Sequence, residues 1–156
     1  MQFSALIDQY AAGPKLVEGA TTGMTREQVL AKPVPSQWST LQVVCHLADF
    51  EIVYADRLKR VIAENGPTLF GGDPDVFAAG LAYHHRDLAE ELALIDACRK
   101  QVTRILRTLK DEDFSRVGKH SEAGPLTLLQ LLERVTEHVP HHVKFIQQKR
   151  QLMGII

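Results

Sequence analysis

The sequence lacks the features of a membrane-spanning, secreted or nucleic-acid-binding chain. No apolar run approaches the ~20 residues needed to cross a bilayer, and residues 1–8 contain no basic segment followed by an apolar one. The formal charge is −1, with 18 basic and 19 acidic residues spread along the chain, so no basic surface for nucleic acid is expected. We therefore expect a cytoplasmic protein that binds neither membranes nor nucleic acids.

Cysteine is also scarce. Cys45 and Cys98 are the only two, and each lies inside an apolar helical pattern. Neither has an evident activating neighbour in sequence, so neither is a strong candidate for a nucleophile. We expect two free, buried thiols rather than a disulfide bond.

Strand-like alternation and internal repeats are absent as well, and apolar residues recur at helical spacing. The composition, 45% apolar and 24% charged, is that of a globular protein, and the length fits one domain covering residues 1–156. The sequence therefore predicts an all-α four-helix bundle with a long connection between the second and third helices. The expected long helices cover about 3–17 with an interruption at Gly13-Pro14, about 40–64, about 85–110, and the segment after Thr127.

Three capping boxes mark helix starts, at residues 25–28, 39–42 and 127–130. In each, a Ser or Thr and a Gln three residues later satisfy the first free backbone N–H groups of a helix. The first box predicts a short helix that ends before Lys32-Pro33, and Trp38 is expected to pack just before the second. Segments 65–80 and 111–125 are interpreted as loops, the former with a turn of helix at 76–78.

Histidine is concentrated in the last helix. His138 and His142 are four residues apart, so they share one face of that helix and supply half of a transition-metal site. A third ligand has to come from elsewhere, and His46 is the one remaining histidine inside a strongly predicted helix. A histidine among apolar residues is also common as an ordinary core side chain, so spacing alone only suggests a site with three histidines.

Pro140 lies between the two candidate ligands of the last helix. It has no N–H, so the carbonyl of Thr136 loses its helical partner and the helix can bend. A bend decides whether His142 or His141, which points about 100° away around the helix, faces the metal. The alternative is that Pro140 only curves the helix around the core.

Supporting roles are open to three side chains near these ligands. Asp49 follows His46 by three residues and could orient its ring or act as a catalytic base, the alternative being an ordinary salt bridge. His141 and His120 are candidates for outer partners of the metal ligands. His84 and His85 are expected to begin the third long helix.

The order Trp38-Ser39, then His46-Leu47-Ala48-Asp49, then His138-x-x-x-His142 resembles that of the DinB/YfiT-like family. The similarity covers most of the chain, from the opening helix with Tyr10 to a Gly118-x-His120 stretch before the last helix. The resemblance implies a four-helix bundle, usually dimeric, in which three histidines bind a divalent metal ion with open positions. Matched residue by residue, the ligands are His46, His138 and His142.

The family includes transferases and isomerases that use low-molecular-weight thiols. The resemblance therefore implies a metal-dependent enzyme acting on a small molecule, either a thiol S-transferase or a related hydrolase. Zinc or nickel is the expected ion, with a low-molecular-weight thiol as co-substrate and a homodimer as the assembly. The alternative is a non-catalytic, metal-binding dimer of helical bundles with a structural or stress-response role.

Overall fold

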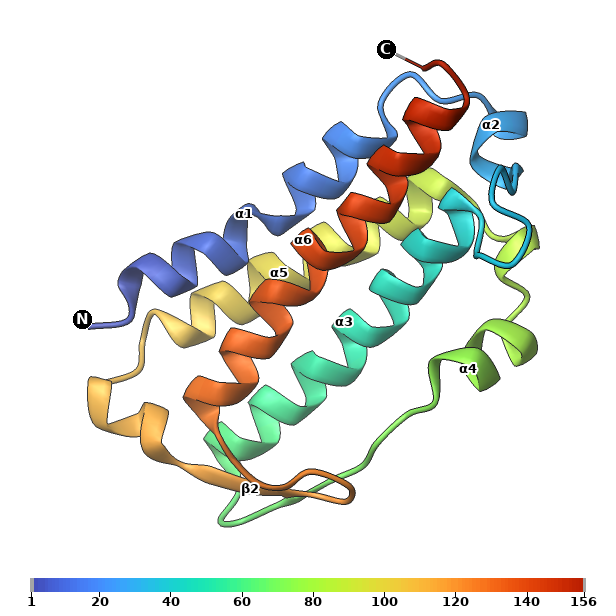
Figure 1. Cartoon of the computed structure of the whole chain (residues 1–156). Coiled ribbons are helices and arrows are strands. Elements are labelled where there is room, and N and C mark those ends of the chain that lie inside the picture. The colour runs from blue at the N-terminus through green and yellow to red at the C-terminus, as the bar shows by residue number, and fades with distance from the viewer. Residues whose placement is uncertain (1, 156) are drawn as a thin grey trace.

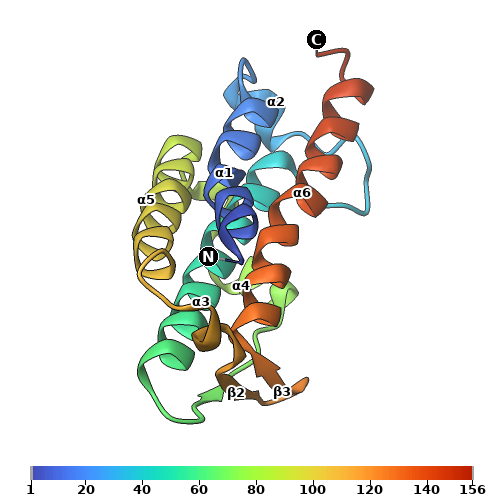
Figure 2. The same ribbon diagram turned by 90° about the vertical axis from the view of Figure 1, so that its left-hand side faces the viewer.

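Four long helices form a bundle, with short helices and a small sheet at its ends (Figures 1 and 2). The structure is a computed structural model that describes residues 2–155. It confirms the predicted fold class. The long helices are α1 (Ser4–Thr21), α3 (Thr40–Ala63), α5 (Leu88–Leu106) and α6 (Leu128–Leu152). The shorter elements are α2 (Arg26–Leu30), β1 (Thr68–Leu69), α4 (Pro74–Gly80), η1 (Tyr83–His85), η2 (Asp111–Ser115), β2 (Val117–His120) and β3 (Gly124–Thr127).

The first two long helices, α1 and α3, are not neighbours in the bundle although they follow each other along the chain. α1 packs mainly against α5 and α6, and α3 packs mainly against the same two helices, so α1 and α3 are diagonally opposed. In Figure 1, α1 and α6 run in one direction and α3 and α5 in the other. The antiparallel pair of α3 and α6 therefore brings the early turns of α3 beside the later turns of α6.

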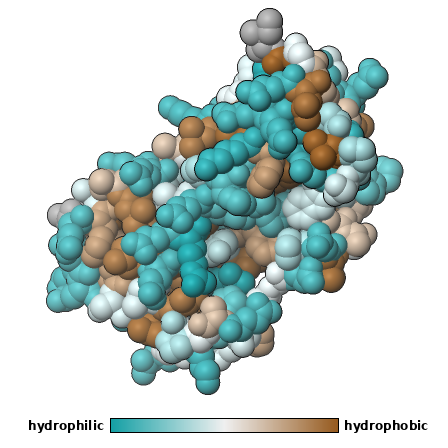
Figure 3. All heavy atoms as spheres, in the orientation of Figure 1, coloured by the Kyte–Doolittle hydropathy of each residue, from teal (hydrophilic) through white to brown (hydrophobic). Residues whose placement is uncertain are grey.

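The core runs along the bundle in two main clusters of buried apolar residues. One lies toward the sheet and includes Leu58, Leu106 and Leu128. The other includes Leu47 on α3 and Val139 on α6, and it surrounds the region that carries the histidines. On the face seen in Figure 3, hydrophilic residues run along the middle of the molecule, and smaller hydrophobic patches flank them.

α1 is not interrupted at Gly13-Pro14, contrary to the expectation. Pro14 has no N–H to offer the carbonyl of Tyr10, but Nη1 of Arg99, on α5, donates to that oxygen at 2.7 Å. A partner distant in sequence thus replaces the missing helical hydrogen bond. The helix continues to Thr21.

The start of α5 also differs, since the helix begins at Leu88 and not at about His85. The carboxylate of Asp87 accepts hydrogen bonds at 2.9 and 3.1 Å from two backbone N–H groups of the first turn. This cap fixes the start of the helix. His84 and His85 lie before it in η1.

The small sheet was not expected, because segment 111–125 was interpreted as a loop. β1 pairs in parallel with β2, and β2 pairs antiparallel with β3. A Cβ on Gly118 would lie 2.8 Å from side-chain atoms of both Leu69 and Val61, so only glycine allows this close packing of β2. The sheet closes the end of the bundle opposite α2 (Figure 1).

Two expectations about composition can be compared with the structure. Both cysteines are free, as expected; Cys45 is buried and Cys98 is partly exposed. Within residues 2–155, no helix combines the length and the apolar character that crossing a membrane requires.

Candidate metal centre

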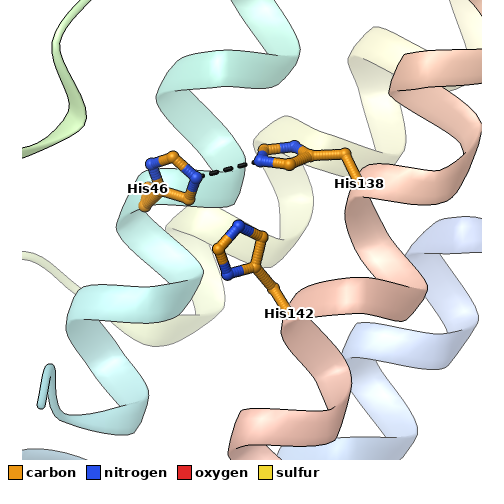
Figure 4. A group of neighbouring side chains, drawn as sticks. All are labelled: His46, His138 and His142. Carbon is orange, nitrogen blue, oxygen red and sulfur yellow. Dashed lines mark hydrogen bonds between the residues drawn. The ribbon is translucent and has the colours of Figure 1, made fainter.

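Three histidine rings from two helices converge between α3 and α6 (Figure 4). His46, His138 and His142 each contribute one ring nitrogen to a group whose atoms all lie within 4.8 Å of one another. The closest pair is Nε2 of His46 and Nε2 of His138, at 2.9 Å. The structure thus brings together the three residues that the sequence suggested.

The local sequence explains how these rings are placed. The Ser39–Gln42 capping box begins α3, so His46 lies about two turns inside the helix, where only 4% of it is exposed. On α6, the helix continues through Pro140 to Leu152. His138 and His142 therefore stay one turn apart on the same face.

Pro140 leaves the geometry of the pair intact, which answers the question of which neighbouring histidine faces the centre. The ring of His142 lies 4.6 Å from that of His46 between centroids. His141 is exposed, and its ring contacts Phe145 at a centroid distance of 5.3 Å. His141 is not a member of the three-nitrogen group.

Aromatic side chains surround the histidines. Phe50 lies 4.6 Å from His46 between ring centroids, Tyr54 lies 6.0 Å from His138, and Trp38 lies 5.2 Å from His46. Sequence reasoning placed Trp38 before the helix cap but missed its contact with His46. It also missed Phe50 and Tyr54. His46, Phe50 and Tyr54 follow one another at intervals of four residues, so they share one face of α3.

The environment keeps the three imidazoles neutral. Burial lowers the pKa of His46 to about 4. Burial and, to a smaller extent, the neighbouring imidazoles lower the pKa values of His138 and His142 to about 3. Neutral imidazole is the form that binds a metal ion, so the ligands need not lose a proton at neutral pH.

The donor set fits a divalent metal ion. Two nitrogens each about 2.0 to 2.1 Å from one ion are separated by about 2.8 to 3.4 Å when the angle between them is about 90 to 109°. The 2.9 Å separation of the two Nε2 atoms lies in that range. The Nδ1 atoms of His46 and His138 are buried and have no hydrogen-bond partner within residues 2–155, so protein groups alone leave the cluster incompletely satisfied.

The carboxylate of Asp49 pairs with Arg86 and not with the histidine cluster. Its two carboxylate oxygens each accept a hydrogen bond of 2.9 Å from Arg86, which also contacts Glu91. Because Nδ1 of His46 has no partner in the described chain, Asp49 does not orient that ring through a hydrogen bond. The salt bridge considered as the alternative is the arrangement in the structure.

His120 also lies apart from the cluster. It is in β2, at the sheet end of the bundle in Figure 1. Its Nδ1 accepts hydrogen bonds of 3.2 Å from the backbone N–H groups of Glu122 and Ala123. These contacts stay within the turn that joins β2 and β3, so they give His120 a local structural role.

Comparison with known proteins identifies the family. A family model described as the DinB superfamily matches residues 9–146. This chain belongs to the DinB superfamily. The resemblance seen in the sequence is thereby confirmed, and the three histidines lie within the matched part.

Two curated proteins of similar sequence are named provisionally as metal-dependent hydrolases. OB0782 of Oceanobacillus iheyensis is 29% identical over 133 residues, which is 85% of this chain and 77% of that protein. YfiT of Bacillus subtilis is 28% identical over 142 residues, which is 90% of this chain and 80% of YfiT. The likeness to each of these relatives extends over most of both chains.

A solved structure of YfiT has the same fold. It matches with a TM-score of 0.89 and 27% sequence identity, and the match covers 96% of this chain and 86% of that one. That protein is described as a "probable metal-dependent hydrolase with an unusual four-helix bundle topology". The bundle topology of this chain is thus shared with YfiT.

Proposed function

We propose that this DinB superfamily chain is a divalent-metal-dependent enzyme whose ion is held by His46, His138 and His142. The observation that carries the proposal is the convergence of three ring nitrogens within 4.8 Å on two facing helices. The names of OB0782 and YfiT support a dependence on metal. Zinc and nickel are the ions we expect, since both accept imidazole ligands.

A divalent ion bound by three imidazoles keeps positions open for a small ligand and lowers the pKa of that ligand. The chain supplies the remaining conditions. Burial holds the imidazoles neutral, and His46, which packs against Trp38 and Phe50, is almost fully buried. The partly exposed His142 leaves one side of the centre open to a substrate.

We propose transfer of a low-molecular-weight thiol as the reaction. No carboxylate belongs to the histidine group in residues 2–155, and Asp49 is held by Arg86. Hydrolysis at a metal centre commonly uses a carboxylate as general base, whereas a thiol that binds a metal ion loses its proton without one. Hydrolysis remains the second candidate, because it is the reaction in the names of the relatives.

Metal analysis and a paired assay test this proposal. Protein prepared without a histidine tag or chelator should contain about one divalent ion per chain, in line with a single three-ligand site. Metal-dependent consumption of a small thiol with an electrophilic acceptor should be lost in His46→Ala and retained in His141→Ala. Absence of metal even after reconstitution would contradict the proposal.

The same assays distinguish the other possibilities. Hydrolysis of an activated ester without any thiol, lost in His46→Ala, would favour the hydrolase. Bound metal that raises the melting temperature but supports neither reaction would favour the non-catalytic bundle.

A further inference from the structure

Lys149 is a buried lysine on α6, about two turns beyond His142. Only 1% of it is exposed. Its Nζ donates one hydrogen bond, to the backbone carbonyl of Phe145 at 3.2 Å, and lies 6.0 Å from the centroid of the Phe145 ring. An ammonium group has three donors, so this carbonyl uses only part of its capacity.

No acidic side chain in residues 2–155 neutralises this lysine. The ion pairs of the described chain all involve other cations. Arg99 is equally buried but is paired with Glu51 at 2.8 Å. Burial lowers the pKa of Lys149, and no neighbouring carboxylate raises it again. A buried cation without a counter-charge is costly, which indicates a role for its unused donors.

Lys149 also lines a pocket beside the histidine cluster. The pocket offers about 300 Å³, a size suited to a small molecule. His142 forms part of its wall, so the pocket lies beside the candidate metal centre. Its lining residues are Ser36, Gln37, Trp38, Val43, His142, Phe145 and Lys149.

The lining combines one cation with apolar and aromatic walls. Trp38, Val43 and Phe145 can cover an apolar chain, while the ammonium of Lys149 supplies a single positive charge. We propose that Lys149 binds the carboxylate of a small substrate in this pocket and holds the rest of that molecule against Trp38 and Phe145, next to His142. Describing the occupant as a substrate rests on the proposed function, whereas the carboxylate site itself does not.

Trp38 gives a direct readout, because it is the only tryptophan in the chain and it lines the pocket. Metal-free protein is titrated with hexanoate and with hexanamide, which differ in charge but hardly in size. Binding is followed by the fluorescence of Trp38 and by the NMR signal of its indole N–H. Wild type should bind hexanoate about tenfold or more tightly than hexanamide, as a hydrogen bond to a charged group implies.

Variants assign the preference to Lys149. Lys149→Met should bind the two probes equally, and Lys149→Arg should keep a preference for hexanoate. Lys144→Met is the matched control, since Lys144 is exposed on the same helix and does not line this pocket. Its preference should equal that of wild type.

The comparison of the two probes in wild type does not depend on whether any variant folds. Equal affinities, or no response of Trp38 to either probe, would overturn the proposal, as would a Lys149→Met variant that still prefers hexanoate. Metal analysis is independent of this titration. A preference for hexanoate without metal binding would support the carboxylate site and contradict the proposed function. Metal binding without a preference for hexanoate would support the proposed function and overturn the carboxylate site.

Discussion

Two clusters of buried polar side chains join the helices, and they differ in how completely their hydrogen bonds are satisfied. In the first, the carboxylate of Glu51 accepts hydrogen bonds from Tyr10 at 2.6 Å and from Nε of Arg99 at 2.8 Å. The other nitrogens of Arg99 donate to the carbonyls of Tyr10 and Val135. In the second cluster, Nδ1 of His46 and of His138 has no partner in the described chain.

This difference separates a structural cluster from a binding site. The Glu51–Arg99–Tyr10 cluster links α1, α3, α5 and α6, and none of its buried side-chain nitrogen or oxygen atoms lacks a hydrogen-bond partner in the described chain. The histidine cluster brings three ring nitrogens together and leaves Nδ1 of His46 and of His138 without a partner in the described chain. The unpartnered nitrogens and the convergence of three metal-binding side chains therefore indicate the histidine cluster as the binding site.

Breaking the structural cluster should have the largest effect on stability. Glu51→Ala leaves Arg99 buried and unpaired, which should lower the free energy of unfolding by about 3 to 5 kcal/mol. Urea unfolding measures this change. Glu64→Ala is the control, since it removes only the exposed Arg60–Glu64 pair and should cost under about 1 kcal/mol. Similar losses in both variants would contradict the structural role of Glu51.

Filling the histidine cluster should stabilise the protein. At a free metal concentration 100 times the Kd, the free energy of unfolding should rise by about 2.7 kcal/mol. Thermal unfolding with zinc, and again after a chelator is added, measures this gain and its reversal. His46→Ala should show no gain. Equal stabilisation of His46→Ala and wild type would mean that the ion binds elsewhere.

Two glycines of α1 provide a finer comparison at the structural cluster. A Cβ on Gly13 would lie 2.0 Å from Nη1 of Arg99, whereas a Cβ on Gly19 would meet nothing within 4 Å. Gly13→Ala should therefore lower the free energy of unfolding by about 1 to 3 kcal/mol. Gly19→Ala should raise it by about 0.5 to 1 kcal/mol, because alanine favours the helix. Urea unfolding that gives both variants the same sign would show that Arg99 does not pack against α1 as described.

The smallest effect is expected at Asp49. Asp49→Asn weakens a partly buried pair with Arg86 and should cost under about 1 kcal/mol. Metal affinity, measured by calorimetric titration, should stay the same, because Asp49 does not hydrogen-bond to Nδ1 of His46. A loss of about 10- to 100-fold, typical of outer partners of metal-bound histidines, would show that Asp49 orients the ring after all.

The sequence predicted the elements whose signals are local. Capping boxes placed the starts of α2, α3 and α6 correctly, and helical spacing paired His138 with His142. His46 was suggested as the third residue because it is the one other histidine inside a strongly predicted helix, and the family resemblance matched it to a metal ligand. Spacing within one helix carries no information about which side chain of another helix faces it.

The errors come from interactions between distant residues or from very short elements. The continuity of α1 depends on Arg99, which lies 85 positions after Pro14 and replaces its missing hydrogen bond. The strands contain two to four residues, too few for alternation to be recognised. Asp87 was a readable cap for α5 and was overlooked. The sequence also does not show that Lys149 is buried without an acidic partner, because this depends on the packing of several helices.

The central claim is that the histidine cluster binds a divalent ion, and metal binding by three proteins tests it most directly. Zinc affinity is measured by calorimetry for metal-free wild type, His46→Ala and His141→Ala. We predict about one ion per chain for wild type and for His141→Ala, and an affinity at least about 100-fold lower for His46→Ala, since a lost ligand should cost no less than a lost outer partner. Unchanged binding in His46→Ala, or no binding in wild type, would contradict the claim.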